Sequence, residues 1–339
     1  MTKRPGLKDV AALAGVSATT VSHVINKTRH VDEMTEKRVL DAIDQLHYVN
    51  NQWARMLKTQ KSNVICLCIG DFNSAFDILL LYYAELYLTR LGYLLHLAHF
   101  TGNPEVDRTT VDGINAMRVC GIILHRTKQY DIDRFCATFK HIPIVCAPGS
   151  LHELDGDPFD TVDTDHEEAT YALVSEMTHK YSRIAFIHGD SFFMTSKQRL
   201  DGYRRAMADA HIPIDPKLVV CGESYADGGY RAMKKLADID DIQAIFVSNN
   251  AMMEGVFRAI NELDPSIPNR VAIVGFDNEN WYALVQPSLT CIEQPVKQIM
   301  ERAIDILLER INGSDRPLVH EIIPSRIVYR NSFRPIEQR

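Results

Sequence analysis

Helical periodicity dominates the first 47 residues of the chain. Apolar side chains recur every three or four positions over three segments, which predicts three short helices. The first covers 7–14 and ends at Gly15, the second begins after the N-cap residue Ser17 and reaches about Asn26, and the third follows Asp32. The positions expected to face inward are Val10, Leu13, Ala14, Thr20, Val21, Val24, Ile25, Val39, Leu40, Ile43 and Leu46.

The second predicted helix has a polar face opposite its apolar one. That face consists of Ala18, Thr19, Ser22, His23 and Asn26. Two helices joined by a short turn that contains a glycine are typical of the helix-turn-helix motif. Small polar side chains suit a close approach to base edges in the major groove of DNA. The pattern therefore predicts an all-α DNA-reading head.

From Ser62 onward, short apolar strands alternate with helices. The expected strands cover 64–69, 93–97, 121–124, 142–145, 184–187, 218–220, 244–247 and 271–274, with a last strand near 327–329. Helices are expected up to about 91 and over 104–118, 131–139, 167–180, 197–210, 228–237 and 251–263. Such alternation predicts an α/β body made of parallel, doubly wound sheets. The strands fall into two sets, so we expect two lobes with a ligand cleft beyond the carboxyl ends of the strands.

These patterns divide the chain into a head over 1–49, a short connecting helix over 50–61 and a body over 62–339. Within the body, the first lobe is expected to take about 62–160 and 291–322. The second lobe is expected to take about 161–290 and 323–339.

Charge is distributed unevenly between the head and the body. The whole chain carries a formal net charge of −7. Residues 1–61 nevertheless hold 10 Lys and Arg against 6 Asp and Glu, whereas the remainder holds 27 against 38. A basic head on an acidic body is expected when only the head meets DNA phosphates.

Several other classes of protein are disfavoured by the sequence. No apolar stretch reaches the ~18 residues of a membrane helix, and the N-terminus lacks the apolar core of a secretory signal. Seven cysteines without a CxxC pair indicate buried thiols in the reducing cytoplasm. The acidic residues over 155–165 do not have calcium-loop spacing, so we expect a solvated segment that crosses between the lobes. We therefore expect no cofactor, no metal site and no membrane partner.

The chain resembles the LacI/GalR family of lactose- and galactose-repressor-like regulators. The resemblance is most specific over 10–26 and continues through 46–48 and 54–58. In the body it rests on Arg199-Leu200-Asp201-Gly202-Tyr203, Val274-Gly275-Phe276-Asp277, Pro287-Ser288-Leu289-Thr290 and Gln294-Pro295. It implies a transcriptional regulator, most simply a repressor, that binds a pseudo-palindromic double-stranded DNA operator as a homodimer and responds to a small-molecule effector.

The resemblance also implies which head residues meet DNA. Ala18, Thr19 and His23 are the base-reading candidates, and Arg29 is a further contact. Leu57 and Lys58 of the connecting helix would enter the minor groove, where a paired leucine wedge unstacks a base step. The full set of expected DNA contacts is Ser17, Ala18, Thr19, Ser22, His23, Asn26, Arg29, Leu57 and Lys58. Leu57 has a simpler alternative role as a buried linker residue.

For the effector cleft, the resemblance implies that Arg199 and Asp277 grip polar groups of a small molecule. The expected effector-binding residues are Phe76, Asp77, Phe193, Arg199, Tyr225, Asn249 and Asp277. Arg199 and Asp277 have the alternative role of a structural bridge between lobes. The aromatic residues, together with Trp281, are equally compatible with core packing.

Several positions depart from the family pattern. Gly6 replaces a Ser or Thr cap, and Asn50 replaces a proline before the connecting helix. Asp77 stands where a second aromatic is usual, which suits a polyol or cationic ligand or a helix cap. Asn250 replaces an aspartate, and His166 stands in the place of an asparagine after Asp165.

Alternative functions stay open at this point. The effector is expected to be a sugar, a sugar phosphate or a nucleobase-like molecule, although control by a protein partner is an alternative. An enzyme or a sugar-binding transport protein could use the same body. However, GxGxxG, Walker A, GxSxG and HExxH motifs are all absent from the sequence. No leucine-zipper pattern follows the last predicted strand, so a dimer is favoured over a tetramer.

Overall fold

The computed structural model describes residues 5–27, 29–48, 62–70, 74–101, 103–125, 132–148 and 159–333, apart from the side chains of Asn26 and 132–134. It forms two compact units, Met1–Ser62 and Asn63–Arg339. The head is all-α and the body is α/β, so the predicted fold class is confirmed. In the described part of the chain, no helix is long and apolar enough to span a bilayer.

The head contains three helices, α1 (Leu7–Ala14), α2 (Ala18–Asn26) and α3 (Glu33–Gln45). Their small core consists of Val10, Ala11, Ala14, Val21, Val24, Val39 and Ala42. The expected inward positions Leu13 and Leu40 are instead 46% and 48% exposed, because the three short helices enclose only this narrow core. Ala42, one turn after the inward Val39, is buried although it was not among the expected inward positions.

Side chains cap the helices of the head as the sequence predicts. Ser17 Oγ accepts from Thr20 N–H at 3.0 Å, and Asp32 Oδ1 accepts from Thr35 N–H at 2.9 Å. At α1, where Gly6 offers no side-chain acceptor, the Gly6 N–H donates to the Asp9 carboxylate at 2.7 Å. This reciprocal contact partly replaces the missing cap.

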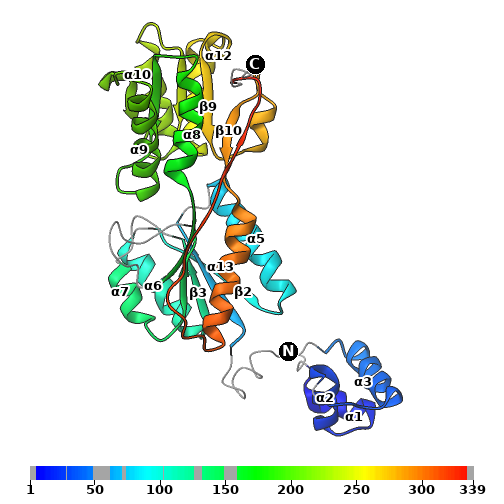
Figure 1. Ribbon diagram of the computed structural model, residues 1–339. Coiled ribbons are helices and arrows are strands. Elements are labelled where there is room, and N and C mark those ends of the chain that lie inside the picture. Colours follow the sequence, from blue (N-terminus) through cyan, green and yellow to red (C-terminus); the bar gives the residue numbers. More distant parts are fainter. Residues whose placement is uncertain are drawn as a thin grey trace, which may run out of the picture. The chain divides into compact units, whose positions relative to one another are not determined.

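The first lobe is built on a parallel sheet in the order β11-β5-β4-β3-β1-β2. Its strands are β1 Val64–Ile69, β2 Leu94–His99, β3 Gly121–Leu124, β4 Ile144–Cys146, β5 Asp160–Thr164 and β11 His320–Ile323. Its helices are α5 Ala75–Arg90, α6 Pro104–Ala116, α7 Ile132–Thr138 and α13 Val296–Ile311. Residues of α5 and α13 form one core with alternate side chains of the sheet, and the two helices lie side by side in Figure 1.

The second lobe repeats this architecture in the order β12-β10-β9-β8-β6-β7, with β12 antiparallel to β10. Its strands are β6 Ile184–His188, β7 Val219–Cys221, β8 Ala244–Val247, β9 Ala272–Phe276, β10 Thr290–Glu293 and β12 Arg326–Val328. Its helices are α8 His166–Thr178, α9 Met194–Asp209, α10 Ala226–Ala237, α11 Asn250–Leu263 and α12 Ile267–Arg270, with 3-10 turns η1 Pro216–Leu218 and η2 Asn280–Ala283. Helices α8 and α9 cover one face of the sheet, while α10 and α11 cover the other.

The chain crosses between the lobes three times. The crossings lie between β5 and α8, between β10 and α13, and between β11 and β12. The expected boundaries near 160, 290 and 322 are therefore displaced by one to a few residues: all of β5 pairs in the first sheet and all of β10 in the second. Strand β5 (DTVDT) is largely polar and β11 (HEII) is half polar, so neither is visible as an apolar run in the sequence. The lobe boundaries next to these strands were therefore placed a few residues away from their observed positions.

The expectation of a solvated acidic segment is wrong for its described part. Asp160 is 2% exposed and Asp163 is 7% exposed, since both lie in β5 at the interior of the sheet. Residues 155–157 lie outside the described residues. Arg310 donates to both carboxylate oxygens of Asp160, at 2.8 and 2.9 Å, and Val319 N–H donates at 2.8 Å. The acidic residue thus joins α13 and β11 to the sheet.

This buried ion pair makes a stability prediction. Burial alone would raise the pKa of Asp160, but hydrogen bonds from Arg310 and Val319 outweigh it and hold the pKa below its ordinary value. Asp160→Asn leaves the Arg310 charge uncompensated and is expected to lower the free energy of unfolding by about 3 kcal/mol in urea titrations. Because the folded pKa is depressed, the difference is full above the unfolded pKa near 3.8 and is lost as the pH falls through the folded value.

The exposed pair between Arg204 and Asp201, at 3.2 Å, supplies the control. Asp201→Asn is expected to change the free energy of unfolding by less than ~1 kcal/mol, as is usual for surface pairs. Equal losses in the two variants would contradict a structural role for the Asp160 pair.

Candidate functional site

A cavity of about 230 Å³ lies between the two lobes of the body. Its walls come from segments that follow the carboxyl ends of strands in both sheets, the position expected for a ligand of doubly wound lobes. All seven effector-binding candidates line this cavity: Phe76, Asp77, Phe193, Arg199, Tyr225, Asn249 and Asp277. The sequence therefore identifies residues that the fold brings together from both lobes. Trp281 does not line the cavity and packs instead against Phe257 and Tyr282 in the second-lobe core.

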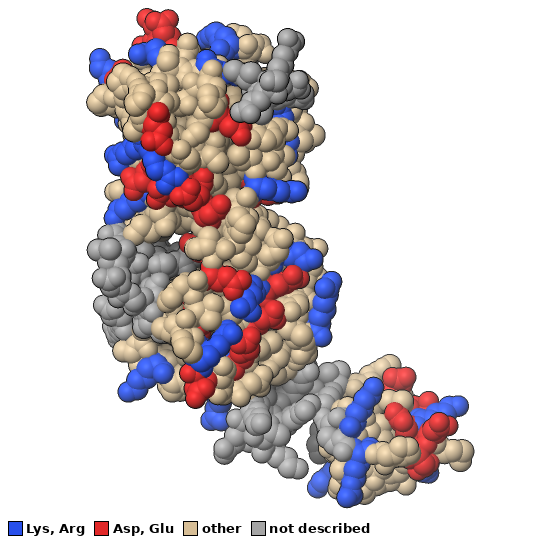
Figure 2. Space-filling model, viewed as in Figure 1, with Lys and Arg blue, Asp and Glu red and all other residues tan. Residues whose placement is uncertain are grey.

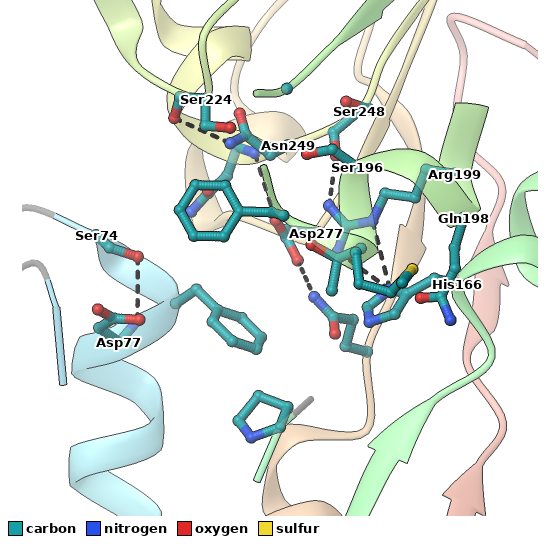
Figure 3. Close-up of a pocket in the computed structure, with 18 of the residues that line it drawn as sticks. Ser74, Asp77, His166, Ser196, Gln198, Arg199, Ser224, Ser248, Asn249 and Asp277 are labelled. Carbon is teal, nitrogen blue, oxygen red and sulfur yellow. Dashed lines mark hydrogen bonds between the residues drawn. The ribbon is translucent and has the colours of Figure 1, made fainter. Parts of the chain in front are cut away.

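Arg199 is buried in the second-lobe wall, and Figure 3 shows its hydrogen bonds to Ser248 and His166. Its Nη1 donates to the Ser248 carbonyl at 2.5 Å, and its guanidinium lies 3.6 Å from the centre of the Phe276 ring. Its Nε and Nη2 face His166 Nδ1 at 3.4 and 3.2 Å. Burial lowers the pKa of Arg199 to about 10, while nearby Asp277 and Asp163 oppose the fall, so the group stays cationic at neutral pH.

Gly202 explains how Arg199 reaches this position. A Cβ at Gly202 would lie 2.3 Å from the Glu167 carbonyl oxygen of α8, so glycine permits a close approach of α8 and α9. Arg199 lies one turn before Gly202 on α9, and His166 is the first residue of α8. The glycine of this sequence motif thus allows the contact between Arg199 and His166.

Asp277 follows β9 with a backbone φ of 71°, in the left-handed region that non-glycine residues seldom adopt. Gln294 Nε2 donates to its Oδ1 at 2.6 Å, and Asn250 N–H donates to its Oδ2 at 3.3 Å. Arg199 and Asp277 both belong to the second lobe, so the alternative of a bridge between lobes does not apply to this pair. Unusual backbone at a cleft residue is typical of a functional site.

The first-lobe wall contains an ion pair between His125 and Asp77. His125 Nε2 lies 3.2 Å from Asp77 Oδ1, and His125 Nδ1 lies 3.1 Å from the Pro148 carbonyl oxygen. Both partners only accept hydrogen bonds, so the contacts favour a ring that is protonated at both nitrogens. Burial alone would lower the pKa of His125, but Asp77 and the Pro148 carbonyl outweigh it and raise the pKa. Asp77 therefore has a partner in the cleft, while the cap of α5 is Ser74.

The hydrogen-bond partners of His166, on the second-lobe side, differ from those of His125. Arg199 has only donors, so His166 Nδ1 accepts from it and carries no proton. His166 Nε2 then donates to Asp163 Oδ1 at 3.2 Å, and the ring is neutral. Asp163 lies on β5 of the first lobe, so the series Asp163, His166 and Arg199 spans the first crossing between the lobes.

Sequence reasoning missed several polar residues of the cavity. These are Ser74, His125, Asp163, Gln198, Ser224, Ser248 and Gln294, and His166 was noted only as a replacement. His125, Ser248 and Gln294 follow directly on β3, β8 and β10. The rule that ligands bind beyond strand ends, applied to every strand, would have identified them. Among the described residues, no group of three or more His, Cys, Asp or Glu side chains could hold a metal ion.

The head places the described DNA candidates on α2 and its flanks. Val21 and Val24 face the core of the head, while Ser17, Thr19 and Arg29 are exposed. Ala18 is half-buried and packs partly on the core, and Ser22 and His23 are half-buried. The Asn26 side chain, Leu57 and Lys58 lie outside the described residues.

Comparisons with known proteins match both units of the chain. Residues 6–51 match the family model described as bacterial regulatory proteins, lacI family, and residues 177–333 match a periplasmic binding protein-like domain. A relative from Pasteurella multocida, named HTH-type transcriptional repressor PurR, is 32% identical over 95% of this chain and 97% of its own length. A second PurR, from Mannheimia succiniciproducens, is 30% identical over 97% of this chain and 99% of its own length. The segment from His23 to Arg29 resembles the purine repressor in particular, in keeping with these names.

Solved structures share the fold over nearly the whole chain. The lac repressor dimer bound to operator and the anti-inducer ONPF has a TM-score of 0.82 and 24% identity, covering 97% of this chain and 99% of that one. The transcriptional regulator CelR in complex with cellobiose has a TM-score of 0.72 and 26% identity, covering 97% of this chain and 100% of that one. Three observations indicate the same family: the head motif, the two-lobed body, and the relatives of at least 30% identity over nearly the full length. The chain belongs to the LacI family of DNA-binding transcriptional repressors and carries the family's periplasmic-binding-protein-like effector domain.

Proposed function

We propose that two copies of this chain bind a near-palindromic operator through α2 and that a small molecule in the interlobe cavity changes their affinity for DNA. The observation that carries the proposal is the cavity itself. It is lined from both lobes, and it contains the buried Arg199 and the strained Asp277 on one wall and Asp77 on the other. A ligand that touches both walls binds one lobe arrangement better than another, and such differential affinity is what shifts a conformational equilibrium.

For the DNA side, we place α2 in the major groove with Thr19 and His23 at base edges and Ala18 against a thymine methyl or the sugar edge. The apolar side of α2 is occupied by the core of the head, which leaves its other side for DNA. Arg29, exposed after α2, adds a phosphate or base contact. Ser17, Ser22 and Asn26 are assigned to nearby contacts, and Leu57 and Lys58 to the minor groove.

DNA contact is assigned to residues 1–61, the head and the connecting helix, and not to the body. On the face that Figure 2 shows, acidic and basic side chains are interspersed over both lobes of the body, and the sequence beyond residue 61 carries a net excess of acidic residues. Phosphates are attracted by Lys and Arg, and residues 1–61 carry an excess of them. Because the operator is chromosomal DNA, we place the protein in the cytoplasm.

The proposed homodimer is supported by the outer side of α5. This helix carries apolar side chains on its outer as well as its inner side: Leu80, Ala84 and Leu88 are buried against the sheet, yet Ile78, Leu79, Tyr82 and Leu86 are between 36% and 55% exposed. Apolar side chains on both sides of a helix are normally buried against another element. A second copy that presents the same face across a two-fold axis would cover these four residues.

The operator prediction follows from the two-fold arrangement. Selection from random duplexes with the full chain is expected to enrich a pseudo-palindrome of roughly 14–18 base pairs, because two heads meet half-sites about one helical turn apart. Affinity for that site is expected to fall roughly a thousandfold or more between about 50 and about 200 mM salt, since counterions are released from the phosphates. Enrichment of asymmetric sites only, or binding that ignores salt, would refute the arrangement.

The cleft prediction concerns Arg199 and Asp277. Arg199→Ala and Asp277→Ala are each expected to remove the response of operator binding to a cleft ligand found by thermal-shift screening of sugars, nucleosides and nucleobases. Loss of a charged hydrogen-bonding partner typically costs ~1.5–3 kcal/mol, which equals the usual coupling of ~1–3 kcal/mol between two sites. Operator titrations with and without the ligand measure the response.

Arg204→Ala is the matched control for the arginine variant. Arg204 lies on the same helix as Arg199, is 58% exposed at its side chain and does not line the cavity. This variant is expected to respond as the wild type does. A normal response in Arg199→Ala would remove that residue from the effector site.

A further inference from the structure

The chemical class of the effector follows from the charges and hydrogen bonds of the cavity, provided that the proposed effector role of this cavity holds. Asp77, Asp163 and Asp277 contribute three carboxylates to the described lining. Arg199 is its one guanidinium, and the described lining contains no lysine. The two imidazoles, His125 and His166, therefore decide the balance of charge.

The hydrogen-bond partners indicate the charge of each ring. His125 faces two acceptors, Asp77 and the Pro148 carbonyl, which favours the cation. His166 accepts from Arg199, which adds no further cation to this count. Three carboxylates thus face two cations, and the described lining keeps an excess of one negative charge. An anionic ligand in such a site meets net repulsion, which is strong because the cavity walls are largely buried.

Several donors of the cavity are engaged within the protein. Arg199 donates to Ser248 and His166, and both ring nitrogens of His125 face acceptors. Asn249 Nδ2 donates to the Ser224 carbonyl at 3.0 Å, and Asn250 Nδ2 donates to Glu279 at 2.8 Å. The remaining donors of the described lining include neutral hydroxyls, such as those of Thr195 and Tyr225. A phosphate or carboxylate, which only accepts hydrogen bonds at full ionisation, would therefore depend largely on neutral donors here.

Acceptors, in contrast, are in surplus. Gln294 is 7% exposed and lines the cavity; its Nε2 donates to Asp277, while its Oε1 is buried with no hydrogen-bond partner among the described residues. Gln198 Oε1 on the second-lobe wall is likewise buried without a partner there. A buried carbonyl oxygen that accepts no hydrogen bond is destabilising, so a ligand that supplies donors is favoured. Each of the three carboxylates can also accept several hydrogen bonds.

We propose that the effector is a ring-shaped amine without phosphate or carboxylate groups, whose amino group meets the carboxylate-lined wall formed by Asp77 and Asp163. The ring has apolar surfaces to lie against, because Phe76, Phe193 and Tyr225 line the same cavity. An amino sugar and an aminated nucleobase or nucleoside both carry this chemistry. Among the ligand classes open from the sequence, sugar phosphates are excluded by this proposal.

Matched pairs of compounds test the amino group directly. Binding to the full chain is measured by calorimetry for glucosamine and glucose, adenosine and inosine, and cytidine and uridine, together with glucosamine 6-phosphate and adenosine 5′-monophosphate. In at least one pair the amine is expected to bind about tenfold more tightly than its partner, the usual effect of one hydrogen bond to a charged group. The pair that shows the difference tells an amino sugar from a nucleoside. If, in every pair that binds, the compound without the amino group binds as tightly as its amine, or if a phosphorylated compound binds as tightly as its amine, the proposal is overturned.

A second experiment measures the sign of the electrostatic potential in the cavity, and it gives a result even if none of these compounds binds. A cationic and an anionic nitroxide of the same size are added to the protein, and relaxation of the Met194 methyl signal is compared, because Met194 lines the cavity. The methyl of Met34, which is 79% exposed in the head, serves as reference. The cationic probe is expected to relax Met194 more strongly than the anionic one. Equal effects, or a stronger effect of the anionic probe, overturn the proposal.

Two variants test whether the carboxylate of Asp77 contributes to the preference for an amine. Asp77→Asn removes one carboxylate while keeping the side-chain shape, and it is expected to reduce the preference for the amine, because the amine loses one of its two carboxylate partners. Glu105→Gln removes an exposed carboxylate of α6 outside the cavity and is expected to leave this preference unchanged. If a glucose- or phosphate-type ligand proves to shift operator binding, the effector-controlled function stands and only the amine proposal fails. If no cleft ligand alters operator binding while the amine still binds, the proposed function fails and only the preference of the cavity for an amine stands.

Discussion

The body of this repressor depends on how the chain passes between its two lobes. Each crossing joins a strand of one sheet to an element of the other lobe, so the lobes can move only through these short segments. Two crossings are tied to each other: Thr164 Oγ1 donates to the Ile323 carbonyl at 2.7 Å, and Ser325 N–H donates to Asp165 Oδ1 at 2.7 Å. Hydrogen bonds between adjacent crossings restrict the lobes to few arrangements, and a ligand can then select among them.

The ligand-facing arginine is attached to this hinge. Asp163 belongs to the first sheet, His166 begins the first helix of the second lobe, and Arg199 extends from the next helix into the cavity. A ligand that contacts Arg199 therefore acts on a side chain whose position depends on both lobes. The ion pair of Asp77 with His125 lies on the opposite wall and gives it a different polarity, so a ligand bound as we propose would meet different groups on the two walls.

Much of the fold and part of the site follow from the sequence because local chemistry determines them. Apolar strands such as Val64–Ile69, caps such as Ser17 and the glycine-containing turn of the head are visible as patterns. Arg199 and Asp277 were found through family motifs. Strand β5 was missed because its buried Asp160 is compensated by Arg310, 150 positions later, and such a distant partner leaves no local pattern. The position of His125 directly after β3 could have been predicted, but its contacts with Asp77 and Pro148 could not, because those residues lie in other segments.

Reciprocal linkage tests the central claim that the cleft controls DNA binding. If a ligand changes operator affinity by a given factor, operator DNA must change the affinity of the cleft for that ligand by the same factor. Calorimetric titration of the free protein and of its operator complex with the same cleft ligand measures this directly. The account predicts two ligand affinities that differ by roughly 5–150-fold, matching the ratio of operator affinities. Equal ligand affinities for the free and the operator-bound protein would contradict it.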